Sequence, residues 1–116
     1  RTRAAYSWTV ETSIYVHKDC RRGGVGKLLL VELEKQLKAQ NVLNVYACIT
    51  SKEIEDEYST HDSIHFHDKM GYTKIGEFKN SGLKFNRWYD VVFMEKMLGE
   101  HNSNPAPVIP LPELLK

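Results

Sequence analysis

Apolar and polar positions change their period along this 116-residue chain, and the changes predict alternating strands and helices. Aromatic and β-branched residues dominate residues 6–16, which favours a strand, and their broken alternation suits a central strand covered on both faces. Residues 25–40 have the spacing of an amphipathic helix, and residues 42–50 are a second apolar strand candidate. A strand, a helix and a strand in this order predict a crossover unit in an α/β fold.

The helix predicted at residues 25–40 has an apolar and a polar face. We expect its apolar face to lie in the core; it carries Leu29, Leu30, Leu33 and Leu37. The opposite face carries Glu34, Lys35 and Lys38. We expect Asn41 to end the helix.

A polar stretch at residues 51–59 contains an acidic run, Glu53 to Glu57, which we expect to be a solvated face. Thr60 or Asp62 then predicts the start of a helix that runs to about residue 70. Gly71 follows where the left-handed residue at a helix end belongs.

Two further strands are predicted at residues 72–78 and 88–98. The segment between them contains Asn80-Ser81-Gly82, a hairpin-turn signal. All four prolines then fall within residues 102–112. We therefore expect one domain over residues 1–98 and a proline-rich tail over residues 99–116 that lies outside the core.

Charge and composition exclude several classes of partner. Sixteen basic residues against fifteen acidic ones give a formal charge of +1, which argues against a nucleic-acid partner. No run approaches the roughly 18 apolar residues of a membrane span, so we expect no membrane partner. Two cysteines, Cys20 and Cys48, have no metal-ligand spacing and indicate reduced thiols, so a cytoplasmic location is expected.

A basic, glycine-rich turn at residues 17–27 leads directly into the first predicted helix. Glycines allow close backbone approach, and the N-terminal N–H groups of a helix bind anions. Arg21, Arg22 and Lys27 add positive charge, so the turn predicts a phosphate or pyrophosphate ligand. The alternative is an ordinary tight turn with solvated basic residues.

Two common phosphate motifs fail at this turn. A P-loop needs Gly where Arg21 stands and Ser or Thr where Leu28 stands. The dinucleotide fingerprint needs a small residue where Leu29 stands. Neither nucleoside-triphosphate hydrolysis of the P-loop type nor dinucleotide binding is therefore favoured.

Residues 21–26, RRGGVG, match the Q/R-x-x-G-x-G/A signature of the GCN5-related N-acetyltransferases (GNAT). Three further segments resemble the phosphinothricin acetyltransferase and L-amino acid N-acyltransferase branch of that superfamily. They are YSWTVETSIYV at residues 6–16, SIHFHDKMGY at 63–72 and GLKFNRWYDV at 82–91. The four motifs occur in the family's order and cover about residues 1–98.

The resemblance implies the α/β GNAT acyl-CoA N-acyltransferase fold, in which helices flank a mixed central sheet. It also implies acetyl-CoA as the acyl donor and a homodimer. Family members begin with a strand, two helices and two strands ahead of the equivalent of Arg1, so the resemblance implies that this N-terminal part is missing here.

By the same resemblance, the pyrophosphate of acetyl-CoA is bound by Arg21, Arg22, Gly23, Gly24, Val25, Gly26 and Lys27. The pantetheine arm pairs with the backbone of Ile14, Tyr15 and Val16, and Ser63 touches the cofactor. One departure concerns this last contact: Thr60 stands where the family usually has Asn.

Glu11 is the expected general base, because the attacking amine must lose a proton and the family places its base at this strand position. A carboxylate on a mostly apolar strand is costly to bury without a task or a partner, and burial raises its pKa. The alternative is an exposed or salt-bridged Glu.

His67 matches the family's helix histidine near the thioester sulfur and is expected to protonate or hydrogen-bond the departing thiolate. The alternative is a structural histidine. His61 and His65 are four residues apart, with His67 nearby, which is a spacing that could bind a metal ion. Without a cysteine or a well-placed carboxylate, however, we expect no metal.

Arg1, Arg3 and Tyr6 match positions that contact the acidic acceptor in the phosphinothricin-type enzymes. A guanidinium suits a carboxylate or phosphinate through paired hydrogen bonds, whereas the alternative is solvated charge at a chain end. By the same resemblance we expect three further residues to line the pocket, across a dimer interface as in the family: Lys84, Arg87 and Trp88. The alternative is that they only pack in the hairpin.

The expected function is acetyl transfer from acetyl-CoA to the primary amine of a small amino acid or analogue, such as phosphinothricin or methionine sulfoximine. Direct attack on the thioester is expected. One alternative is a different amine, such as a polyamine, an aminoglycoside or a protein N-terminus. The other is a coenzyme-A-binding fragment without catalysis.

Overall fold

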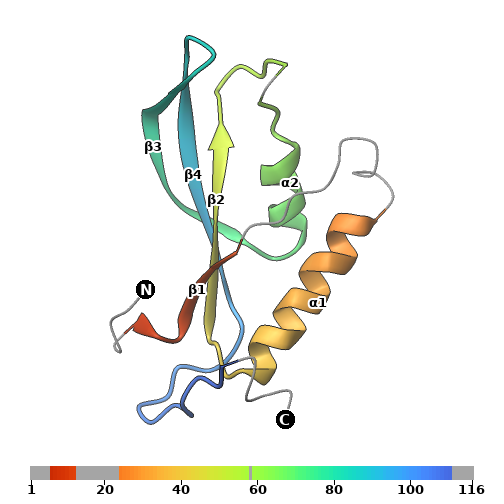
Figure 1. Cartoon of the computed structure of the whole chain (residues 1–116), viewed down its shortest axis with the longest axis vertical. Coiled ribbons are helices and arrows are strands. Elements are labelled where there is room, and N and C mark those ends of the chain that lie inside the picture. The colour runs from red at the N-terminus through yellow and green to blue at the C-terminus, as the bar shows by residue number, and fades with distance from the viewer. Residues whose placement is uncertain (1–5, 13–23, 58, 111–116) are drawn as a thin grey trace. The chain divides into compact units, whose positions relative to one another are not determined.

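The computed structural model describes residues 6–12, 24–57 and 59–110. Its strands are β1 (Thr9–Thr12), β2 (Asn44–Ser51), β3 (Thr73–Lys84) and β4 (Arg87–Met97). Its helices are α1 (Val25–Ala39) and α2 (Asp62–Lys69). The strands form one sheet in the order β1-β2-β4-β3 (Figure 1). The neighbouring places of β1 and β2, with α1 between them in the chain, agree with the predicted crossover unit.

The chain divides into two compact units. Unit 1 comprises residues 1–45 and 97–116, and unit 2 comprises residues 46–96. The buried apolar side chains of unit 1 are Leu30, Leu37, Val42 and Val45. Those of unit 2 are Ala47, Ile49, Tyr72, Tyr89, Val92 and Met94. No helix of the described residues is long and apolar enough to cross a membrane.

Helix α1 begins and ends close to its predicted bounds, but it buries a different face. Asn41 ends the helix as predicted, in a left-handed conformation (φ 68°) that lets the Val42 N–H bond back to the Leu37 carbonyl at 3.0 Å. Leu30 and Leu37 are buried as predicted, whereas Leu29 is 48% exposed. Glu34, predicted on the solvated face, is buried.

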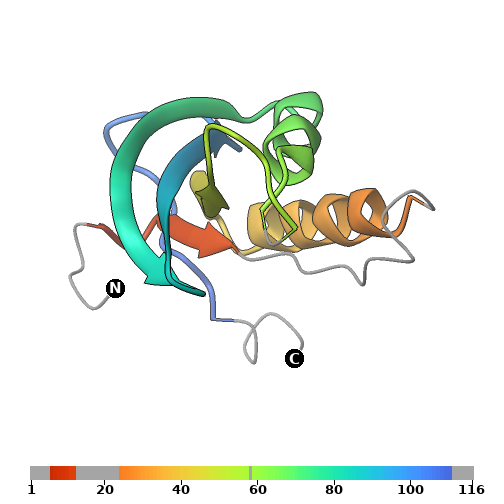
Figure 2. The same cartoon turned by 90° about the horizontal axis from the view of Figure 1, so that it is seen from above.

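The β3–β4 hairpin turns later than predicted. Lys84 pairs with Arg87, so the two-residue loop is Phe85-Asn86, and both loop residues have positive φ (53° and 59°), as in a type I′ turn. The predicted turn signal at residues 80–82 instead marks an irregularity inside β3. This irregularity and another near Gly76 accompany the strong bend of β3 in Figure 2.

The segment after β4 forms neither a helix nor a strand up to residue 110, and its hydrogen bonds tie it to the rest of unit 1. The Ile109 N–H donates to the Gln40 carbonyl, and Gln40 Nε2 donates back to the Ile109 carbonyl, both at 2.9 Å. Trp8 Nε1 donates to the Ala106 carbonyl at 2.9 Å. The proline-rich residues thus fasten the end of α1 and the segment that leads into β1.

Candidate functional site

Glu11 lies on the short strand β1, which starts at Thr9, three residues later than predicted. The backbone N–H groups of Leu43 and Asn44 both donate to the Trp8 carbonyl at 3.0 Å, which fixes the start of β1. Glu11 is exposed, whereas Thr12 beside it is buried. The exposed side chain agrees with the alternative given for Glu11 from the sequence, so burial does not act on this carboxylate in the described structure.

The N-terminus of α1 carries the described part of the glycine-rich motif. Gly24 has φ 79°, a left-handed conformation that favours glycine, and a Cβ added there would meet no atom within 4 Å. No acidic residue lies in the first turn, and no side chain caps the helix among the described residues. Gly26 is buried, and Lys27 is exposed. The start of α1 thus offers backbone N–H groups and positive charge, and within the described residues no acidic side chain of its own first turn neutralises them.

Several predicted site residues lie outside the described part of the chain. They are Arg1, Arg3, Ile14, Tyr15, Val16, Arg21, Arg22 and Gly23. Tyr6 is described and is 50% exposed, in a turn ahead of β1.

The structure brings Ser63 and His67 together on α2. His67 is 4% exposed, and its Nδ1 lies 2.8 Å from the Ser63 carbonyl and 3.4 Å from the Ser63 hydroxyl. Because a carbonyl only accepts, Nδ1 must carry the proton, and in the neutral ring Nε2 then holds a lone pair. Ser63 is exposed at the start of the helix.

The end of α2 packs Tyr72 against His67. Gly71 is left-handed as predicted (φ 92°), and the Tyr72 N–H reaches the His67 carbonyl at 2.9 Å. The two rings meet edge to face, with centroids 5.1 Å apart. This contact and the Ser63 hydrogen bond together fix the imidazole in one orientation.

His61 and His65 lie close, with ring centroids 6.3 Å apart. His61 Nε2 donates to the Lys52 carbonyl at 2.7 Å. Within residues 6–12, 24–57 and 59–110, no three His, Cys, Asp or Glu side chains are placed to hold a metal ion.

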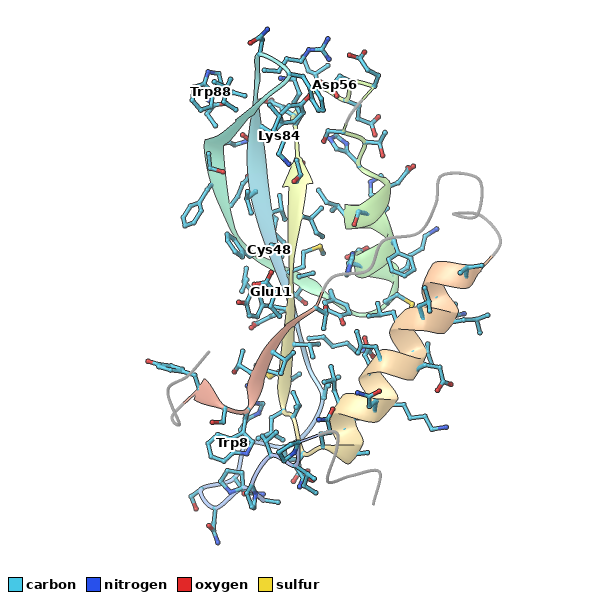
Figure 3. All side chains as sticks on the ribbon, viewed as in Figure 1. Trp8, Glu11, Cys48, Asp56, Lys84 and Trp88 are labelled. Atoms are coloured by element: carbon cyan, nitrogen blue, oxygen red, sulfur yellow. The ribbon has the colours of Figure 1, made fainter. Side chains whose placement is uncertain are left out.

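The acidic run is more than a solvated face, because Asp56 forms a cluster with the start of β4. Arg87 Nη1 donates to Asp56 Oδ2 at 3.2 Å and also to a Glu57 carboxylate oxygen. The Tyr89 hydroxyl donates to Asp56 Oδ2 at 2.9 Å, and the Ser59 N–H donates to Asp56 Oδ1 at 2.9 Å. Figure 3 places Asp56 near the tip of the hairpin.

Two side chains of this cluster, Arg87 and Tyr89, have shifted pKa values. The hydrogen bonds that Arg87 donates to the Glu57 carboxylate, and then those to the Asp56 carboxylate, raise the pKa of Arg87. Burial, followed by the Asp56 carboxylate, raises the pKa of Tyr89. The cluster could not be predicted from the sequence, because Asp56 and its partners on β4 stand about thirty positions apart. The sequence signals that could have suggested an ion pair were the acidic run at residues 53–57 and Arg87 beside a predicted strand.

Three hairpin residues were expected to line an acceptor pocket. One of them, Arg87, is bound to the carboxylates of Asp56 and Glu57 in its own chain. Lys84 is exposed, and Trp88 is 52% exposed and points away from Asp56 in Figure 3. The Trp88 carbonyl accepts a hydrogen bond from Lys52 Nζ at 3.2 Å.

Comparison with known proteins gives consistent matches. A sequence profile described as an acetyltransferase (GNAT) domain matches residues 1–93. The chain is 32% identical to a phosphinothricin N-acetyltransferase of Streptomyces viridochromogenes, over 98% of this chain and 58% of that protein. It is also 32% identical to the L-methionine sulfoximine/L-methionine sulfone acetyltransferase of Salmonella typhimurium, over 91% of this chain and 58% of that protein.

Solved structures of acetyltransferases resemble the fold of this chain. The crystal structure of a phosphinothricin acetyltransferase from Sinorhizobium meliloti in complex with acetyl-CoA matches with a TM-score of 0.79 and 34% identity, over 98% of this chain and 59% of that one. The chain thus spans somewhat more than half the length of the relatives it matches. Since the profile covers most of the chain and the sheet has solved counterparts, the chain belongs to the GNAT acetyltransferase family.

Proposed function

We propose that the protein moves an acetyl group from acetyl-CoA to the primary amine of a small amino acid or analogue, of the phosphinothricin or methionine sulfoximine type. Membership of the GNAT family and the names of the relatives support the reaction and the substrate class. The observation that carries the proposal is the N-terminus of α1, where left-handed Gly24 opens a helix start with no acidic residue in its first turn.

The donor set at this helix start fits a pyrophosphate. The open space beside Gly24 admits a phosphate oxygen to the backbone, and the helix dipole favours negative charge there. In the proposal the pyrophosphate lies against residues 21–27, the pantetheine arm pairs with the backbone of residues 14–16, and Ser63 contacts the cofactor. Acetyl-CoA supplies the activated acyl group.

Glu11 is the proposed general base. Its side chain is exposed, and in the proposal it takes, directly or through a water, the proton that the amine loses as it attacks the thioester carbonyl. Arg1, Arg3 and Tyr6 are the proposed contacts for the acidic group of the acceptor.

His67 is the proposed partner of the departing thiolate. With Nδ1–H bound to the Ser63 carbonyl, the ring can turn only Nε2 toward a reacting group. The neutral ring can accept a hydrogen bond there, and only the imidazolium can give a proton to the thiolate. The Ser63 carbonyl accepts from Nδ1–H in both forms, so it holds the ring through the proton transfer.

The test is turnover with a panel of amines, followed by thiol release from acetyl-CoA. We expect Glu11→Gln to lower kcat about 100-fold while acetyl-CoA binding, measured by calorimetry, is unchanged. Unchanged kcat in this variant would remove Glu11 from its role. Preference for a polyamine, an aminoglycoside or a peptide N-terminus would change the acceptor class, and binding without turnover would indicate a non-catalytic coenzyme-A-binding protein.

Four other features stay predictions from the sequence. They are a cytoplasmic location, a homodimer, the C-terminal part of an acetyltransferase domain at residues 1–98 and a proline-rich tail at residues 99–116. Sedimentation of the purified chain tests the second of these.

A further inference from the structure

The strongest unassigned feature of unit 2 is the way Asp56 joins two distant segments. Its two carboxylate oxygens accept hydrogen bonds from Arg87, Tyr89 and the Ser59 backbone. Arg87 and Tyr89 belong to β4, whereas Ser59 belongs to the segment that leads into α2. Asp56 therefore ties this segment to the sheet.

The same segment holds the first turn of α2. Glu55 Oε2 accepts a hydrogen bond from the His61 N–H at 2.6 Å, and the Thr60 hydroxyl accepts one from the Asp62 N–H at 3.3 Å. His61 in turn donates to the Lys52 carbonyl. A helix of eight residues is marginal by itself, so its first turn depends on these external bonds.

The first turn of α2 contains the group that orients His67. The Ser63 carbonyl accepts from His67 Nδ1 at 2.8 Å, four residues along the helix. If this turn frays, the carbonyl moves away and the imidazole loses the acceptor that fixes its tautomer. The contacts of the imidazole with the rings of Phe66 and Tyr72 are edge-to-face aromatic contacts, which do not select one tautomer.

We propose that Asp56 is a positioning residue that acts through His67. By tying Ser59, and with it the residues that lead into α2, to Arg87 and Tyr89, it keeps the first turn of α2 in place. It thereby holds His67 in the Nδ1–H tautomer, with Nε2 available to the reacting group. The catalytic consequence rests on the proposed function, whereas the coupling from Asp56 to the His67 ring does not.

The test compares Asp56→Ala with Lys74→Gln in the intact chain. The second variant is the control, because it removes an exposed ion pair with Glu77 elsewhere in unit 2. Long-range proton–nitrogen NMR of ¹⁵N-labelled protein reads the His67 tautomer, and amide hydrogen exchange reads residues 63–67. We expect the Nδ1–H form in the native chain and in Lys74→Gln, and a mixture of tautomers with roughly tenfold faster exchange in Asp56→Ala.

Two further variants separate positioning from general loss of folding. Arg87→Gln leaves the hydrogen bonds from Tyr89 and Ser59 to Asp56 in place, so we expect a tautomer mixture and exchange rates between those of the native chain and those of Asp56→Ala. Asp56→Glu keeps the carboxylate, so we expect it to restore part of the native tautomer population and exchange rates. A native tautomer and native exchange rates in both Asp56→Ala and Arg87→Gln would overturn the proposal.

Kinetics add an independent reading. We expect Asp56→Ala to lower kcat about tenfold with little change in the KM of the amine, since Asp56 acts on His67 and not on the acceptor. If the native chain has no turnover, the proposed function fails while the NMR comparison still decides the coupling.

Discussion

The two units hold distant segments together by different means. In unit 2 the bonds that join separated segments include charged groups, such as Arg87 with Asp56 and Lys79 with Asp90. In unit 1 the side chains that bind the segment after β4 are neutral: Trp8, Gln40 and Asn41 each donate to a backbone carbonyl. Charged bonds respond to pH and salt, whereas neutral ones respond little. The units should therefore lose structure under different conditions.

The largest effect should follow from removing residues 101–116. The deletion removes the Ala106, Pro107 and Ile109 carbonyls that serve Trp8, Asn41 and Gln40. It also removes the Ile109 N–H that donates to the Gln40 carbonyl and the hydrogen bond between His101 and Asn44. With each neutral hydrogen bond worth about 1 kcal/mol, we expect a loss on the order of 5 kcal/mol in the free energy of unfolding. Urea titration followed by circular dichroism measures it, and the loss should be the same at low and high salt.

Trp8→Phe is the matched control for this deletion. It removes a single indole hydrogen bond and should cost about 1 kcal/mol. A deleted chain as stable as the full one would show that the segment after β4 is not part of the folded unit.

A smaller effect, dependent on pH, is expected in unit 2. Asp90 is buried, and its pKa is lowered first by the Asn80 N–H, which donates to it at 2.8 Å, and then by the Lys79 ammonium. A lowered pKa means that the carboxylate stabilises the fold above its ordinary pKa near 3.8 and that this stability is lost as pH falls through the lowered value.

Asp90→Asn should therefore lower the free energy of unfolding by about 1 kcal/mol at pH 7 and by less at pH 3. Thermal unfolding at the two pH values measures the difference. Equal losses at both would contradict the role given to the charge, and Lys74→Gln serves as the exposed control.

The smallest effect concerns the hairpin loop. Phe85 has φ 53°, a conformation that Asn adopts more readily, so Phe85→Asn should raise the free energy of unfolding by about 0.5–1 kcal/mol. Asn86→Ala, at φ 59°, should lower it by a similar amount. Urea titration of the two variants gives opposite shifts if the loop is Phe85-Asn86, and a turn at residues 80–82 would leave both unchanged.

Local patterns predicted the elements well, because helix ends and strands follow from neighbouring residues. Asn41 and Gly71 end the two helices as predicted, each in a left-handed conformation. The face that α1 buries was less predictable: Leu29 and Glu34 exchange the places that helical spacing gave them. Distant segments of the chain determine which face of α1 is covered. The spacing of residues within the helix carries no information about those segments.

The hairpin shows the same limit. Asn80-Ser81-Gly82 has turn chemistry, but Asp90 on the opposite strand binds the Asn80 N–H, and the chain continues as β3. For the candidate site, the motifs predicted roles for Glu11, Ser63 and His67 that stay predictions, and the structure adds the tautomer of His67 and the exposure of Glu11. The contacts of Asp56 with Arg87 and Tyr89 could not be predicted, because both partners come from a strand far along the chain.

Gly99 stands where the chain leaves β4, beside the Leu98 N–H that donates to the Leu43 carbonyl at 2.7 Å. A methyl group at this position would come within 2.9 Å of Leu43 Cδ2, so any larger residue forces Leu43 into another rotamer. The identity of residue 99 is thus a marker that can be read in other members of the family. Those with glycine here can route the following segment across the end of α1, and those with a bulky side chain should send it along a different path.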